Sequence, residues 1–265
     1  MKQKRERNYK PLVLLLLSIA WLTACTQSRP VKSCETYTEA KDPDTTYVDW
    51  SPVDGLNYSF GTIDQRYAKS AIPDIPQSAS WSGSGWRGET ISAQLVLWSD
   101  QAVDQIEFEF SAFKSASGGT LDPSIGQARF VRYVLTDIFV PGCGYRKPED
   151  FPVSLSADAL DNVSCFDMAA KTTLPVWLTF NVPADAKPGT YTGTLSLHAQ
   201  HQSSKELTLS IEVLPQTLPA PSDWAFHLDL WQHPSAIARV HGVKVWSEEH
   251  WELMKAPMKM LADAG

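Results

Sequence analysis

The sequence predicts a mainly β fold, in which an antiparallel β-sandwich precedes a truncated first β/α unit of a (β/α)8 barrel. Three observations support this prediction. Apolar and polar residues alternate over much of residues 47–215, as in strands with one buried and one solvated face. A proline-rich linker, residues 216–223, ends that pattern. Residues 224–265 then combine one short alternating run with one helical stripe, which is the order of a β/α unit.

The first 24 residues have the composition of a signal peptide. Basic residues crowd the first ten positions and precede an apolar core, residues 11–24, that is shorter than a membrane-spanning helix requires. The core ends in Leu22-Thr23-Ala24-Cys25, which resembles the lipobox of bacterial lipoproteins. This resemblance implies that Cys25 is acylated and that lipid alone anchors the protein, on the periplasmic or cell-surface side of a membrane. An ordinary cleavage site beside a chance cysteine is the alternative.

Residues 25–46 are rich in Ser, Thr, Asp, Lys and Pro, and they suit a flexible tether between the lipid and the folded domain. Besides Cys25 the chain contains Cys34, Cys143 and Cys165. Outside the cytoplasm a Cys143–Cys165 disulfide would close a polar loop and leave Cys34 unpaired in the tether, but the sequence leaves this pairing open. No Cys-x-x-Cys or His-x-x-x-His pair indicates a metal site. We expect neither a metal nor a cofactor.

The chain is acidic, with 23 Lys and Arg residues against 30 Asp and Glu residues and a net charge of −7. Removal of the basic leader would make the remainder more acidic. Nucleic acid demands a basic binding surface, so we expect no nucleic-acid partner. The acidity identifies no substrate, because on an exported protein it serves solubility.

Six segments of the middle region alternate clearly and are predicted to be strands. They are 90–97, 106–110, 130–135, 176–182, 191–197 and 207–213, with weaker strands near Tyr58 and over 79–81. Turn sequences such as Lys187-Pro188-Gly189 separate them. Eight strands are enough for a two-sheet sandwich over residues 47–215.

The segment from Gly144 to Thr173 interrupts this alternation, because it is polar and its apolar residues do not recur at a regular spacing. At this length it is predicted to be a functional or interface loop. A solvent-exposed loop without a function of its own, held by Cys143 and Cys165, is the alternative.

Residues 224–265 are predicted to form one strand and one helix. Phe226, Leu228 and Leu230 alternate with polar or aromatic residues, as in a strand. Ser247 is the predicted N-cap of the helix, and acidic residues follow it in the first turn, where the helix dipole favours them. Pro257 predicts a kink, or a break into two helical pieces.

Three blocks of the sequence resemble glycoside hydrolase family 123, as found in gut-type Bacteroidetes. They are residues 182–193 (VPADAKPGTYTG), residues 85–89 with 94–98 (GWRGE and QLVLW), and residues 227–232 (HLDLWQ). The blocks occur in the order of the family, and the similarity runs from about Tyr47 to Gly265.

The resemblance implies a β-sandwich followed by a (β/α)8 barrel with β-N-acetylgalactosaminidase activity on glycans that end in an N-acetylhexosamine. It also implies substrate assistance, in which the acetamido oxygen of the sugar attacks the anomeric carbon. One Asp orients that group, and a neighbouring Glu protonates the leaving oxygen, whereas most retaining enzymes use a carboxylate nucleophile. No Asp followed directly by Glu occurs in residues 1–265, and Glu149-Asp150 has the reversed order, so the role is not assigned to it. We therefore expect the pair beyond the chain end, assign no catalytic residue, and expect this chain alone to be inactive.

The candidate substrate-binding residues are His227, Asp229 and Trp231, because alternate residues of a barrel strand point to one face. On the lumen side, Trp231 would stack on a sugar ring while Asp229 or His227 hydrogen-bonds a hydroxyl. In the alternative, Trp231 packs against the linker and Asp229 caps a turn.

The sequence around Trp86 offers a second, weaker candidate. Arg87 and Glu89 are predicted to form an ion pair at a structural corner, and a glycan platform is the alternative.

Two functions therefore remain open. The chain is either the N-terminal part of a lipid-anchored glycoside hydrolase or a non-catalytic, lipid-anchored β-sandwich that binds carbohydrate or a protein partner.

Overall fold

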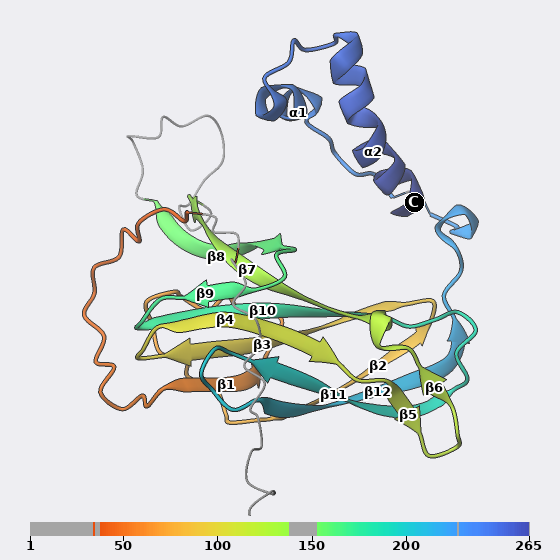
Figure 1. The fold of residues 1–265 in the computed structure, drawn as a ribbon. Helices are drawn as coiled ribbons and strands as arrows, with labels where there is room; N and C mark the ends of the chain where they lie inside the picture. The colour runs from red at the N-terminus through yellow and green to blue at the C-terminus, as the bar shows by residue number, and fades with distance from the viewer. Residues whose placement is uncertain (1–33, 35–37, 138–152, 227, 265) are drawn as a thin grey trace, which may run out of the picture. The chain divides into compact units, whose positions relative to one another are not determined.

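The computed structural model describes residues 34, 38–137, 153–226 and 228–264. Its strands build a two-sheet β-sandwich, and two helices follow in the chain (Figure 1). The predicted mainly β fold class is confirmed. None of the helices in the described ranges is both long and apolar enough to cross a membrane.

The first sheet has five antiparallel strands in the order β1-β3-β10-β7-β8. Their bounds are β1 Leu56–Gly61, β3 Thr90–Ser99, β7 Gly126–Thr136, β8 Ser154–Asp161 and β10 Thr172–Asn181. Strand β10 lies at the centre and pairs along its whole length with β3.

The second sheet has seven strands, with the path β2-β12-β11-β4-β9 and two short strands, β5 and β6, beside β11. Their bounds are β2 Ser80–Arg87, β4 Val103–Phe110, β5 Phe113–Ser115, β6 Thr120–Leu121, β9 Phe166–Met168, β11 Gly189–His198 and β12 Lys205–Thr217. Strand β2 pairs with β12 in parallel, which corrects the expectation of purely antiparallel sheets. Parallel pairing is possible here because no hairpin joins these two strands, which are far apart in the sequence.

All six clearly alternating segments are strands, and the two weaker ones form parts of β1 and β2. Strand β12 continues to Thr217, and the Leu218 N–H donates to the Arg87 carbonyl. The sandwich therefore extends slightly beyond the predicted boundary at residue 215. In the linker, Pro221–Asp223 form a single turn of 3-10 helix, η3.

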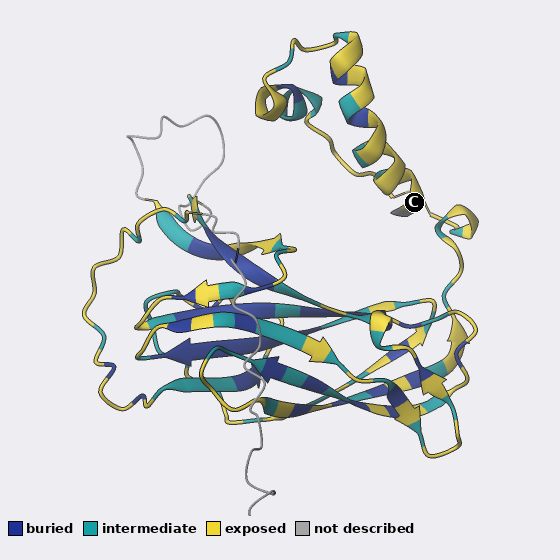
Figure 2. Cartoon of the chain, viewed as in Figure 1, coloured by how far each residue is buried: buried dark blue, intermediate teal, exposed yellow. Residues whose placement is uncertain are grey.

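The core lies between the two sheets, where Figure 2 shows the buried residues concentrated in the strands. Phe180 of β10 is at its centre. Its ring stacks on Trp81 at 5.2 Å between centroids and meets Phe110 and Phe113 edge-on at about 6 Å. Aromatic contacts of this geometry stabilise a core beyond the area they bury.

A second apolar cluster covers the outer face of the first sheet. Val96 and Trp98 of β3 pack there against Trp50, Val53 and Tyr67. These partners come from irregular segments before β1 and between β1 and β2. This sheet is therefore covered on both faces.

The segment from Gly144 to Thr173 is not simply a loop. Residues 138–152, which include Cys143, lie outside the described residues, but β8 and β9 occupy much of the remainder. Strand β8 pairs with β7 from Thr136 to Phe130, with one register shift between Arg132 and Tyr133. The loop prediction was wrong here because an edge strand with one partner does not need strict alternation.

The C-terminal segment contains helices α1 (Pro234–His241) and α2 (Glu248–Ala264). Ser247 caps α2 as predicted, since its hydroxyl accepts the His250 N–H at 3.2 Å. Helix α2 continues through Pro257, so the predicted break into two helical pieces is wrong, while the alternative of a kink stays a prediction. Residues 226–230 form no strand among the described positions, which corrects the predicted strand. A strand needs a neighbour to satisfy its backbone, and no described strand pairs with this run.

Candidate functional site

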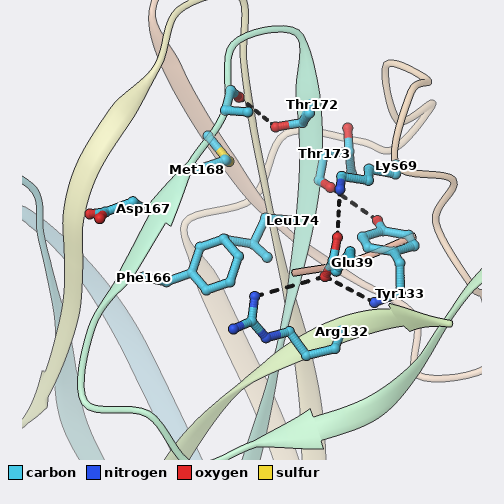
Figure 3. Close-up of a pocket in the computed structure, with 11 residues that line it drawn as sticks. Glu39, Lys69, Arg132, Tyr133, Phe166, Asp167, Met168, Thr172, Thr173 and Leu174 are labelled. Carbon is cyan, nitrogen blue, oxygen red and sulfur yellow. Dashed lines mark hydrogen bonds and ion pairs between the residues drawn. The ribbon is translucent and has the colours of Figure 1, made fainter. Parts of the chain in front are cut away.

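A hollow of about 170 Å³ opens at one end of the sandwich, and we call it the Glu39 pocket (Figure 3). The N-terminal segment, the connection after β1, and strands β7, β9 and β10 supply its walls. Its lining residues are Glu39, Lys69, Arg132, Tyr133, Phe166, Asp167, Met168, Ala169, Thr172, Thr173 and Leu174.

Glu39 is the centre of this pocket, although its side chain is only 7% exposed. The Lys69 ammonium lies 2.5 Å from one carboxylate oxygen. The other oxygen accepts the Tyr133 backbone N–H at 3.1 Å and lies 3.9 Å from Arg132 Nη1. A buried carboxylate is tolerated only with such compensation, because burial removes its water.

Arg132 and Tyr133, adjacent on β7, complete the arrangement. Arg132 Nε donates to Asp161 at 2.8 Å, and the guanidinium lies 4.4 Å from the centre of the Phe166 ring. The Tyr133 hydroxyl lies 2.9 Å from the Tyr67 carbonyl and 3.0 Å from that of Thr173, so its single proton is shared between them. Burial, reinforced by the negative charge of Glu39, raises the pKa of Tyr133, which keeps this hydroxyl protonated.

This chemistry favours structural anchoring over catalysis. Groups of the same chain provide the counter-charges of Glu39 and Arg132, and the Tyr133 hydroxyl is unsuited to proton transfer near neutral pH. Pockets for drug-sized ligands usually have volumes above about 300 Å³, whereas this one is smaller. The Glu39 pocket therefore serves to hold the N-terminal segment against the sandwich. Sequence reasoning missed it, because Glu39 lies in a stretch with tether-like composition and no periodicity.

A disulfide joins Cys34 to Cys165, with 5.3 Å between the two Cα atoms. This excludes the Cys143–Cys165 pair that the sequence had left open, since Cys165 can form only one disulfide. Cys34 and Glu39, both in the predicted flexible tether, are attached to the sandwich by the disulfide and by the Glu39 contacts. Cys143 and the proposed lipidation site Cys25 lie outside the described residues.

A second hollow, of about 370 Å³, lies beside β6 and the segment 183–191. Its charged lining residues are Asp122, Asp185 and Lys187. Asp122 caps the short 3-10 helix η1, Pro123–Ile125, by accepting the Ser124 N–H at 2.8 Å. Its hydrogen bonds with Ser124 lower the Asp122 pKa. The carboxylate of Asp122 is therefore already used within the chain.

The structure does not bring the predicted substrate-binding residues into a pocket. Asp229 and Trp231 lie in an irregular segment before α1, and Trp231 is 93% exposed. The alternative in which Trp231 packs against the linker is therefore wrong. Instead, Trp224 contacts the linker, since its Nε1–H donates to the Pro219 carbonyl at 3.0 Å. His227 lies outside the described residues.

The corner between β2 and β3 is held by a different contact from the predicted ion pair. Glu89 accepts the backbone N–H of Trp86 at 2.7 Å, and no ion pair between Arg87 and Glu89 is found within the described ranges. Gly88 has a φ of +83°, which suits glycine at this tight turn. Trp86 remains 41% exposed.

The two C-terminal helices meet at His250, which is fully buried. Its Nδ1 accepts the Trp246 N–H at 2.9 Å, so its other nitrogen, Nε2, carries the proton and donates to the Pro234 carbonyl at 3.0 Å. One imidazole thus links the start of α1 to the start of α2. Across the described parts of the chain, no group of three or more His, Cys, Asp or Glu residues is placed to hold a metal ion.

Comparison with known families assigns both parts of the chain. A family described as glycoside hydrolase 123 N-terminal domain matches residues 60–199, which are most of the sandwich. A second, described as glycoside hydrolase 123, catalytic domain, matches residues 231–265. A search of curated proteins gave no match.

Among solved structures, the chain resembles a family 123 glycoside hydrolase from Clostridium perfringens, which was analysed for glycolipid glycan hydrolysis. The TM-score is 0.71 at 22% identity, over 79% of this chain and 36% of that one. The chain thus spans little more than a third of that structure. Two weaker matches, a PapD-like domain of human CEP192 and the periplasmic chaperone SfaE, have TM-scores of 0.33 and 0.29. Their identities are 12% and 11%; the matches cover 68% and 64% of this chain, and 96% and 61% of theirs.

Proposed function

The chain belongs to glycoside hydrolase family 123, and we propose that it is the N-terminal part of a lipid-anchored enzyme that releases a terminal N-acetylhexosamine from a glycan. The observation that carries this proposal is the order of the two family matches, with the sandwich at 60–199 and the catalytic domain at 231–265. A non-catalytic sandwich protein would have no reason to contain a region that matches the catalytic domain of the family. The order therefore favours part of an enzyme over a binding protein.

The proposed reaction is β-N-acetylgalactosaminidase-like and substrate-assisted. The acetamido oxygen of the sugar attacks the anomeric carbon, an Asp orients it, and a neighbouring Glu protonates the leaving oxygen. Two things support the assignment: the sequence resemblance to the family, and the structural likeness to an enzyme studied for glycolipid glycan hydrolysis. The Asp-Glu pair has no counterpart in residues 1–265, so this chain provides only supporting groups.

Those supporting groups are proposed to be His227, Asp229 and Trp231. Trp231 begins the region that matches the catalytic domain, and Asp229 precedes it by two positions. Both described side chains are exposed, so the indole is free to stack on a sugar ring and the carboxylate is free to accept from a hydroxyl.

The proposed location is the periplasmic or cell-surface side of a bacterial membrane, with lipid on Cys25. The Cys34–Cys165 disulfide supports this proposal, because structural disulfides persist in oxidising compartments.

The proposal is tested with a chromogenic N-acetylgalactosaminide. The 265-residue chain alone should give no turnover, because it lacks the catalytic pair. Turnover that disappears on Asp229→Asn substitution would show that the pair is not required and would overturn the assignment of roles. Reading the nucleotide sequence after codon 265 tests the origin of the chain. An in-frame or frameshifted barrel with an Asp-Glu pair is expected, and unrelated sequence would count against the enzyme.

A further inference from the structure

The N-terminal segment is attached to one end of the sandwich by two independent contacts, which we call the N-terminal staple. The first is the Cys34–Cys165 disulfide, which lies next to the start of β9. The second is the buried Glu39 carboxylate with Lys69 and the Tyr133 N–H. Ser70 adds a hydrogen bond to Asp42 at 3.0 Å. The chain is therefore attached at Cys34 and again at Glu39, well before the first strand.

The linker to the catalytic region leaves the sandwich at the opposite end. Strand β10 runs from one end to the other. Near its start, the Thr173 N–H donates to the Lys69 carbonyl, beside the staple. Just beyond its end, the Val182 N–H donates to the Glu89 carbonyl, in the same corner where the Leu218 N–H donates to the Arg87 carbonyl.

The separation of these two ends follows from the geometry of the strand. Strand β10 has 10 residues, so at about 3.3 Å per residue it spans about 33 Å. Figure 1 shows β9 at one end of the sandwich and the β5–β6 hairpin, like the end of β12, at the other.

The staple also shortens the chain between the proposed lipid and the folded domain. Only residues 26–33 separate Cys25 from Cys34, and at no more than about 3.6 Å per residue this connection reaches about 30 Å. A tether that ended at residue 46 would reach more than twice as far, because it would contain more than twice as many residues.

We propose that the sandwich is a rigid spacer, whose stapled end faces the membrane surface and whose opposite end carries the catalytic region away from it. The inference rests on the proposed lipid anchor at Cys25. What it adds to that anchor is the orientation of the sandwich. The β9 end lies near the lipid surface, and the linker leaves from the end that is farther from the membrane.

The test measures energy transfer from a fluorescent amino acid to an acceptor dye in the membrane. The full chain with its own leader is produced in a bacterial host that acylates lipoproteins, and membranes are collected. The label replaces Ala170, in the β9–β10 turn, or Ala116, in the β5–β6 turn. Both alanines are exposed, so the two positions are matched and differ in the end of the sandwich they mark. A Cys34→Ser/Cys165→Ser/Glu39→Gln chain, which lacks both contacts of the staple, provides the unstapled comparison, with its fold checked by circular dichroism.

The expected result is severalfold higher transfer at Ala170 than at Ala116, and a smaller difference in the unstapled chain. Equal transfer at the two positions in a membrane-bound chain would overturn the spacer role alone. A chain that stays in the soluble fraction, or that remains membrane-bound after Cys25→Ser, would overturn the lipid anchor and the spacer role with it. Membrane fractionation therefore tests the lipid anchor, and the difference in energy transfer tests the orientation of the sandwich.

Discussion

A single carboxylate connects three parts of the sandwich that are far apart in the sequence. Glu39 comes from the N-terminal segment, Lys69 from the connection after β1, and Tyr133 from β7. Desolvation of a buried carboxylate costs free energy, and the ammonium and the backbone N–H offset that cost. Removal of the carboxylate charge would leave the positive charges of Lys69 and Arg132 without this compensation.

Substitution Glu39→Gln should therefore destabilise the sandwich by about 3 kcal/mol, toward the lower end of the range for breaking a buried ion pair, because Lys69 is partly exposed. Urea unfolding monitored by tryptophan fluorescence measures the change. The matched control is Glu206→Gln on β12, where an exposed carboxylate accepts the Ser196 hydroxyl. The control should shift stability by less than about 0.5 kcal/mol. Equal effects of the two substitutions would contradict the structural role of the pocket.

The disulfide provides a second residue-level prediction with a built-in control. Cys34→Ser should lower stability by about 2–4 kcal/mol, because the cross-link spans 131 residues and restricts the unfolded chain. Cys143→Ser should leave the stability of the oxidised protein unchanged, since Cys165 is already paired with Cys34. Thermal unfolding without reductant measures both. The reverse ranking would restore the Cys143–Cys165 pair that the sequence suggested.

Neither of these residue-level features could be predicted from the sequence. Cys143 is much closer to Cys165 in the sequence than Cys34 is, but proximity in space depends on the path of the N-terminal segment. Glu39 lies in a polar stretch without periodicity, and only the fold brings Lys69 and Arg132 to it. Sequence patterns report local structure, whereas these contacts are set by tertiary packing.

At the level of elements, the strands that alternate clearly were predicted correctly because each has one face in the core. The two strands β8 and β9, in the segment 153–173, were missed for different reasons. Strand β8 is an edge strand with partly exposed residues on both faces, and β9 has only three residues. Neither shows a clear period in the sequence.

Helix α1 was also missed, although its ends carry recognisable signals. Pro234 stands at its first position, and Gly242 follows its last residue in the left-handed conformation with a φ of +66°. The N–H of Val243 donates to Ala238 and that of Gly242 to Arg239, which together form a Schellman motif. At eight residues the helix is too short for periodicity to reveal it, so the caps were the usable signal.

His250 provides the prediction at this level. His250→Ala removes two hydrogen bonds and a buried side chain, and should weaken the pairing of α1 with α2 by about 2 kcal/mol. Hydrogen exchange measured by mass spectrometry should become faster across residues 234–264 and remain unchanged in the sandwich. His241→Ala, at the exposed end of α1, is the control and should change little. Unaltered exchange in the His250 variant would mean that the imidazole does not hold the helices together.

At the scale of the whole molecule, the two parts differ in how completely they bury their apolar residues. The sandwich has a continuous core around Phe180 and a second cluster on its outer face. The C-terminal helices and their connection bury Ala238, His250 and Met254, but leave exposed a set of large apolar side chains: Val240, Trp246, Trp251, Met258 and Met260. The order of these parts was predicted from the sequence, where the alternation typical of strands gives way to the spacing typical of a helix. That change marks the end of sheet packing and the start of helix packing.

This difference predicts an order of proteolysis for the intact, oxidised chain. Trypsin should cleave first after Arg239 or Lys244, because segments with few buried contacts open locally at low free-energy cost. Cleavage after Lys41 should be slow although its side chain is exposed, because the disulfide and Glu39 hold that segment. In the Cys34→Ser/Glu39→Gln chain, the Lys41 site should be cleaved as readily as the C-terminal sites, while the rest of the sandwich persists. Mass spectrometry of timed digests measures both orders. Equal resistance of the C-terminal helices and the sandwich in the unsubstituted chain would show that the exposed apolar side chains are covered in solution, by the sandwich or by a second copy.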